Sequence, residues 1–173
     1  MLKDELVERL KRLDEDAWLI YRNPARFSIV IVGGGALVLL GFLSRATQDI
    51  DVLHVPKEIL SLLSKYDINC QVQAYVNNFP YNYEDRLVKL PIVGKRIDFY
   101  SASLEDIVVA KLYSNRPTDK KDVENPSILQ AIDWEKLENM ACNENEARAS
   151  ALNESNYFYF KQNYDEYVRR FRP

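Results

Sequence analysis

Residues 31–52, IVGGGALVLLGFLSRATQDIDV, carry the pattern from which the rest of the fold can be worked out. They continue a β-branched run, SIVIV, that predicts a buried strand over residues 28–32. The three glycines that follow predict a turn, and the apolar run over 36–43 predicts a short buried helix. The alternation in DIDVLHV predicts a second strand over 49–55. The order is therefore strand, glycine turn, helix, strand.

Two carboxylates and the glycine turn form the first candidate site. Asp49 and Asp51 are two apart on the second predicted strand, so both leave one face with Cα atoms about 6.6 Å apart. Such a pair can share a divalent ion, and Mg²⁺ prefers hard oxygen ligands. The backbone N–H groups of the turn can receive phosphate oxygens. Considered alone, the pair could also be an exposed DxD in a turn. The turn consists of Gly33, Gly34 and Gly35.

A third carboxylate, Asp98, lies within the predicted strand KRIDFY over residues 95–100. An acidic residue in so apolar a strand could complete the metal site or act as a base. The alternative is a salt bridge to Arg96 or Arg86.

Basic side chains flank these carboxylates. Lys111 falls in the middle of the apolar face of a helix that opens with a capping-box pattern at residue 103. A lysine there needs an anion, either a nucleotide phosphate or an active-site carboxylate, unless it snorkels to solvent near the helix end. Arg45 and Thr47 precede the aspartate pair, and Arg45 could reach a phosphate or tie the loop to a carboxylate. The run that follows the Lys111 helix could be a solvated face or set a substrate loop; it comprises Asp119, Lys120, Lys121 and Asp122.

The composition of the chain excludes several classes of function. The chain has 173 residues, 23 Lys+Arg, 26 Asp+Glu and a net charge of −3, which excludes a globally basic nucleic-acid coat. Its two cysteines are too few for a disulfide framework or a cysteine-ligated metal site, so the expected compartment is a reducing cytoplasm. The charged start does not resemble a secretory signal. Glycines interrupt the uncharged stretch over 27–44, so no membrane partner is expected.

The rest of the chain predicts an α+β fold, with a small mixed sheet flanked by helices and a C-terminal helical tail. We expect a core with its N-terminal helix over residues 1–116 and a helical region over 117–173. The expected elements are an amphipathic helix over 2–20, a helix after Pro56, a strand over 67–76, a loop over 77–85, a hairpin over 87–92 and 95–100, and a helix from 103 to 116.

An aromatic stripe at helical spacing marks the last predicted helix. It is typical of a buried core or a homodimer face. The alternative is a stacking platform for an RNA end, with nearby arginines to meet phosphates. The stripe comprises Tyr157, Phe160, Tyr164, Tyr167 and Phe171.

The glycine turn, the spacer over residues 36–48 and the aspartate pair together resemble the motif of the DNA-polymerase-β-like nucleotidyltransferase superfamily. Residues 31–52 are similar to the version in abortive-infection-type (AbiEii-like, type IV) toxin nucleotidyltransferases and their uncharacterised bacterial relatives. The tract IDFYSASLEDIVVAKLYSNRPTDKKDV, residues 97–123, is similar to their second half. The glycine-serine pair usual in the superfamily is Gly34-Gly35 here, which removes a hydroxyl but keeps the backbone donors.

The resemblance implies a minimal nucleotidyltransferase fold, two Mg²⁺ ions and transfer of an NMP from an NTP to an acceptor hydroxyl. Asp49 and Asp51 would bind metal, and Asp98 would complete the site and activate the acceptor. Lys111 would contact the triphosphate. The acceptor would be an RNA or tRNA end or a protein, and a toxin would have a cognate antitoxin. A catalytically silent nucleotide-binding or regulatory protein of the same fold is the alternative.

Overall fold

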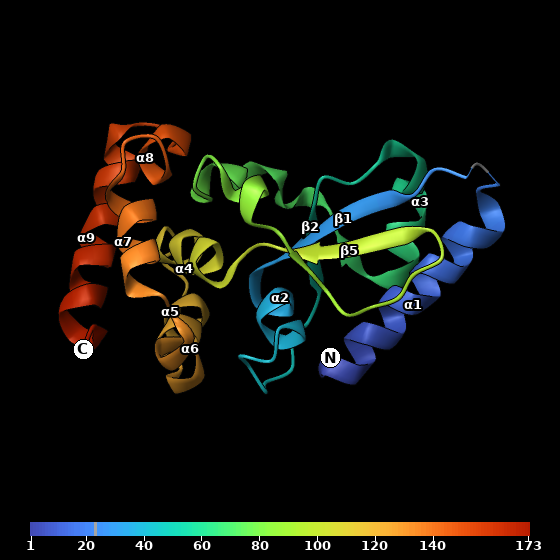
Figure 1. The fold of residues 1–173 in the computed structure, drawn as a ribbon, viewed down its shortest axis with the longest axis horizontal. Helices are drawn as coiled ribbons and strands as arrows, with labels where there is room; N and C mark the ends of the chain where they lie inside the picture. Colours follow the sequence, from blue (N-terminus) through green and yellow to red (C-terminus); the bar gives the residue numbers. More distant parts are fainter. Residues whose placement is uncertain (23) are drawn as a thin grey trace. The chain divides into compact units, whose positions relative to one another are not determined.

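The computed structural model describes residues 1–22 and 24–173 (Figure 1). The chain forms two compact units, described separately below. The sheet unit contains Met1–Gln73 and Leu87–Ala102, and the helical unit contains Ala74–Arg86 and Ser103–Pro173. This division differs from the expected boundary after residue 116, because the helix that carries Lys111 groups with the C-terminal helices. Within the described residues, no helix has the length and apolar content needed to cross a bilayer.

The sheet unit has one mixed sheet of five strands in the order β3-β2-β1-β5-β4, which confirms the expected α+β fold. The central strand β1 runs antiparallel to β2 and parallel to β5, and Figure 1 shows β1 and β5 side by side. β3 is parallel to β2, and β4 is antiparallel to β5. The elements are α1 (Lys3–Ile20), β1 (Phe27–Val32), α2 (Gly33–Leu39), β2 (Ile50–Leu53), α3 (Leu60–Leu63), β3 (Ile68–Asn69), β4 (Val88–Lys89) and β5 (Ile97–Ser101).

The N-terminal helix, predicted over residues 2–20, packs on this unit through leucines at helical spacing. Leu6, Leu10 and Leu13 are fully buried. On the same helix the buried Asp14 carboxylate accepts three backbone N–H bonds, from Lys95 at 2.7 Å and from the next two residues at 2.8 and 2.6 Å. These bonds join α1 to the start of β5.

Three expected elements differ in extent from the structure. β2 begins at Ile50, so Asp49 lies just before the strand. The strand expected over 67–76 is limited to β3, and Gln71–Asn78 form a 3-10 helix. The hairpin is present, but its first strand pairs at only two positions.

The helical unit consists of α4 (Leu104–Leu112), α5 (Pro117–Val123), α6 (Pro126–Ala131), α7 (Trp134–Cys142), α8 (Ala147–Ser150) and α9 (Glu154–Phe171), with a 3-10 helix over Tyr83–Arg86. Helix α4 packs against both α7 and α9. The aromatic stripe on α9 contributes to the core. Phe160, Tyr164 and Tyr167 are buried, and Phe160 stacks on Tyr113, the C-cap residue of α4, at 4.3 Å between ring centroids. Of the uses that the sequence allowed, packing within this unit is the one observed.

Candidate functional site

The glycine turn and the aspartate pair lie in contact at one end of β1. Val32, the last residue of β1, is paired with Asp51 of β2. Gly33 follows with φ +66°, and a Cβ atom there would lie 3.1 Å from Oδ2 of Asp51. A glycine is required because this backbone conformation disfavours other residues and because the carboxylate occupies the space. The three glycines form the first turn of α2 rather than the separate turn that the sequence predicted, and the first of them lies against the Asp51 carboxylate.

The next two glycines face the loop that leads into β2. A Cβ atom on Gly34 would lie 3.0 Å from Nη2 of Arg45, and one on Gly35 would lie 3.6 Å from the backbone oxygen of Asp49. Thr47 is buried in this loop and donates from Oγ1 to the same Asp49 oxygen at 3.2 Å. The Arg45 guanidinium thus lies against the glycine turn, where it can add positive charge, and the Asp49 side chain is exposed.

A residue that the sequence analysis did not select orients Asp51. Asn69 of β3 is paired with Asp51 in the parallel register, and its Nδ2 donates to Oδ1 of Asp51 at 2.9 Å. The Asn69 Oδ1 atom accepts the backbone N–H of Gln71 at 3.0 Å, which fixes the amide. The sequence offers no signal for this role, because only strand pairing places Asn69 opposite Asp51.

The structure does not bring Asp98 to this pair, which corrects the expectation that it completes the site. In β5, Asp98 is paired with Ser28, four positions along β1 from Val32, the partner of Asp51. Four residues of strand span about 13 Å, and β2 and β5 lie on opposite sides of β1. Alternation along the strand predicted the face on which Asp98 lies but not the end of the sheet.

Asp98 instead forms a salt bridge, the alternative that the sequence allowed, but with different partners. Arg26 binds both carboxylate oxygens, at 2.7 and 2.9 Å, and Lys89 Nζ lies 3.1 Å from Oδ1. The hydrogen bonds from Arg26, and then those from Lys89, lower the pKa of Asp98 to about 2 despite partial burial. Asp98 therefore remains a carboxylate in a structural ion pair.

Lys111 is buried, as its place on the apolar face of α4 predicted, and its anions lie within the helical unit. Its Nζ contacts Oδ1 of Asp119 at 2.5 Å and Oδ2 of Asp122 at 2.9 Å. Burial opposes ionisation of Asp119, but the charge of Lys111 and hydrogen bonds from Lys111, Ser114 and Arg116 outweigh it and lower the pKa. Both aspartates are buried, so they do not belong to a solvated face.

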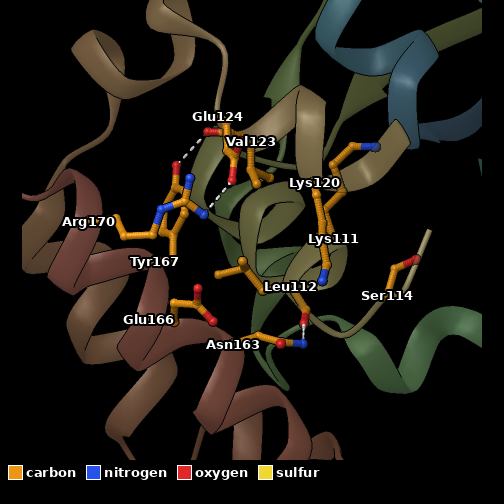
Figure 2. A pocket seen from close by; sticks show the side chains of 10 residues that line it. All are labelled: Lys111, Leu112, Ser114, Lys120, Val123, Glu124, Asn163, Glu166, Tyr167 and Arg170. Atoms are coloured by element: carbon orange, nitrogen blue, oxygen red, sulfur yellow. Dashed lines mark hydrogen bonds and ion pairs between the residues drawn. The ribbon is translucent and has the colours of Figure 1, made fainter. Parts of the chain in front are cut away.

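A pocket beside Lys111 is shown in Figure 2, where α9 forms one wall and α5 the other. Arg170 pairs with Glu124 at 2.9 Å, and Tyr167 donates to the Val123 carbonyl at 2.6 Å across it. Its volume is about 60 Å³, far below the roughly 300 Å³ at which ligand pockets begin. This pocket is too small to enclose a nucleotide.

The donors at the glycine turn suit a hard cation. Asp49 and Asp51 offer carboxylate oxygens, the ligands that Mg²⁺ prefers, beside backbone N–H groups that can meet phosphate. Among the described residues, no group of three or more His, Cys, Asp or Glu side chains is arranged to hold a metal ion. An ion at this place would therefore have fewer than three such side chains among the described residues, and its other positions would be left for water and phosphate oxygens.

Comparison with known families gives a match over nearly the whole chain. Residues 8–172 match the family described as "Nucleotidyltransferase of unknown function (DUF6036)". No curated protein and no solved structure shows a significant match. The matched range includes the glycine turn, the aspartate pair and both units.

Proposed function

Because the chain belongs to this family of nucleotidyltransferases, we propose that it transfers an NMP from a Mg²⁺-bound NTP to an acceptor hydroxyl. The acceptor oxygen forms a bond to the α-phosphorus, the bond from that phosphorus to the β-phosphate oxygen breaks, and pyrophosphate leaves. The hydroxyl proton passes to solvent, since Asp98 is not in place to accept it.

One observation carries this proposal: the contact between the glycine turn and the aspartate pair. Gly33 lies against the Asp51 carboxylate, and Gly34 lies against Arg45. The Asp51 carboxylate, the backbone donors and a cation thus lie close together at one end of β1. Nucleotidyl transfer needs mostly this kind of charge stabilisation and positioning.

Each residue has a separate role in the proposal. Asp49 and Asp51 would hold the ion, which when bound neutralises triphosphate charge and polarises the α-phosphate. The N–H group of Gly34 would receive a phosphate oxygen, because the first N–H groups of a helix have no partner within it, whereas Gly35 is buried. Arg45 would counter the charge that builds on the leaving pyrophosphate, and Thr47 would hold the Asp49 loop in shape.

The direct test is label transfer. Purified protein is incubated with each α-³²P-labelled NTP, Mg²⁺ and either total cellular RNA or total cellular protein. We expect label on one acceptor class, lost in Asp49→Ala and in Asp51→Ala. Asp98→Asn is the matched control, because this carboxylate lies at the other end of the sheet, and it should retain transfer. Transfer that survives Asp51→Ala would contradict the proposed site.

A catalytically silent nucleotide-binding or regulatory protein of the same fold is the second candidate. The observation that favours it is the absence of a third carboxylate at the pair within the described residues. In that case the protein would bind NTP, depending on Asp51, without transferring label to RNA or to protein.

A toxin role is a narrower form of the first candidate, and it rests on the resemblance of residues 31–52 to the abortive-infection-type enzymes. The acceptor would then be an RNA or tRNA end or a protein of the host cell, and a cognate antitoxin would neutralise the activity. Growth arrest on expression, relieved by Asp51→Ala, would support this role, and unaffected growth would oppose it.

A further inference from the structure

We infer that this site works with a single divalent ion, bound together with the triphosphate, rather than with the pair of ions that its superfamily implies. The inference rests on the proposed function and concerns the same carboxylates. It follows from what surrounds Asp51 and from where the other acidic side chains of the chain lie.

A second ion lacks the ligand that the sequence predicted for it. Two catalytic ions lie about 3.5–4 Å apart, and each needs its own carboxylate oxygens because the two dications repel. Asp98 is about 13 Å further along the sheet. It is also held by the bidentate Arg26 and by Lys89, so recruiting it would leave both cations without their partner.

The buried acids of the helical unit are committed as well. Asp106 and Glu146 both pair with Arg86, at 2.8 and 3.1 Å. Glu105 pairs with Lys136 at 2.7 Å. The remaining buried acids, Asp119 and Asp122, pair with Lys111. Using any of these as a metal ligand would require breaking an ion pair inside the unit, which is costly because a buried charge is left unmatched.

The contacts of the two Asp51 carboxylate oxygens also favour a single ion. A carboxylate that bridges two ions presents one oxygen to each. The Oδ1 atom of Asp51 accepts a 2.9 Å hydrogen bond from Asn69, which takes up one of its two lone pairs. Oδ2 is the atom turned toward Gly33, in the glycine turn that would receive the phosphates. The geometry therefore favours one ion, placed between Asp49, Asp51 and the phosphates.

The test counts ions without relying on turnover. Full-length protein is dialysed against Mn²⁺, a paramagnetic substitute for Mg²⁺, with each of the four α,β-methylene NTPs, which cannot release pyrophosphate. Bound manganese and nucleotide are then quantified, and frozen samples are examined by electron paramagnetic resonance. We expect one Mn²⁺ per bound nucleotide and an uncoupled six-line spectrum. Two Mn²⁺ per nucleotide, with the exchange-coupled spectrum of a close pair, would overturn the inference.

Two variants complete the experiment. Asp51→Asn should weaken Mn²⁺–nucleotide binding at least tenfold, whereas Asp98→Asn should leave both the affinity and the count of one unchanged. A fall in bound manganese in Asp98→Asn would also overturn the inference. If the wild type bound none of the four nucleotides, the proposed function itself would fail, and this result is distinct from a count of two.

Discussion

The amide nitrogen of Asn69 donates a 2.9 Å hydrogen bond to Oδ1 of Asp51 across the parallel pair β2 and β3. The same asparagine accepts the Gln71 N–H at 3.0 Å. Asp51 is thus oriented by a side chain that is itself held by the backbone. A carboxylate oriented in advance binds a metal without first losing rotamer freedom, so Asn69 is a positioning residue in this site.

Replacement of Asn69 tests this positioning role. Asn69→Ala should weaken Mn²⁺–nucleotide binding about tenfold, because supporting groups of this kind typically contribute 10–100-fold to metal affinity. The free energy of unfolding should fall by only about 1 kcal/mol, the typical contribution of one hydrogen bond. Titration calorimetry with Mn²⁺ and an α,β-methylene NTP measures the affinity, and urea denaturation measures the stability.

Asn69→Asp serves as its isosteric counterpart. It keeps an acceptor for the Gln71 N–H but puts a second negative charge against Asp51, so binding should weaken at least as much as in Asn69→Ala. Wild-type affinity in both variants would show that Asp51 needs no support from β3.

The glycine turn gives a matched pair of alanine substitutions. Gly33 has φ +66°, and an added Cβ would lie 3.1 Å from Oδ2 of Asp51. Gly33→Ala should therefore cost about 1–2 kcal/mol in unfolding free energy and displace the carboxylate. At Gly35 a Cβ would meet the Asp49 backbone oxygen at an ordinary 3.6 Å, so Gly35→Ala should change stability by no more than about 1 kcal/mol. Equal losses in the two variants would contradict this account.

The sequence predicted those parts of the site that depend on local pattern. Periodicity located β1 and β2, and the pattern of glycines, spacer and aspartates predicted that the glycines lie beside the second strand. The sequence did not predict the end of the sheet at which Asp98 lies. Alternation along a strand predicts the face of the sheet on which a side chain lies, but its position along the neighbouring strand depends on the strand register.

Tertiary pairing explains the other differences. Asn69 contacts Asp51 because of the β2–β3 register, and no local sequence pattern predicts that register. For Lys111 the pattern correctly predicted a buried cation that needs an anion. The anion was supplied by α5, because the turn between α4 and α5 folds Asp119 and Asp122 back onto Lys111.

The buried Lys111 cluster predicts a large stability effect. Lys111→Met removes the cation from two buried carboxylates and should destabilise the protein by about 3–5 kcal/mol. Adding Asp119→Asn and Asp122→Asn to Lys111→Met should recover part of this loss, since no buried charge then remains unmatched. The exposed Lys121→Met is the control and should change stability by less than about 0.5 kcal/mol. Urea denaturation distinguishes these outcomes, and a Lys111→Met variant as stable as wild type would contradict the structural role.

The Asp98 ion pair predicts a pH dependence whose sign follows from its pKa. Hydrogen bonds from Arg26 lower the folded-state pKa to about 2, against about 3.9 in an unfolded chain. The pair therefore stabilises the fold fully above pH 4 and loses its contribution as the pH falls toward 2. Because Arg26 and Lys89 are 43% and 62% exposed, solvent screens the ion pair and its contribution at pH 7 is small. A double-mutant cycle of Arg26→Met and Asp98→Asn, followed by urea denaturation, should give a coupling energy that is constant from pH 7 to 5 and falls below pH 4. A coupling that persists undiminished at pH 2.5 would mean that the carboxylate is not its source.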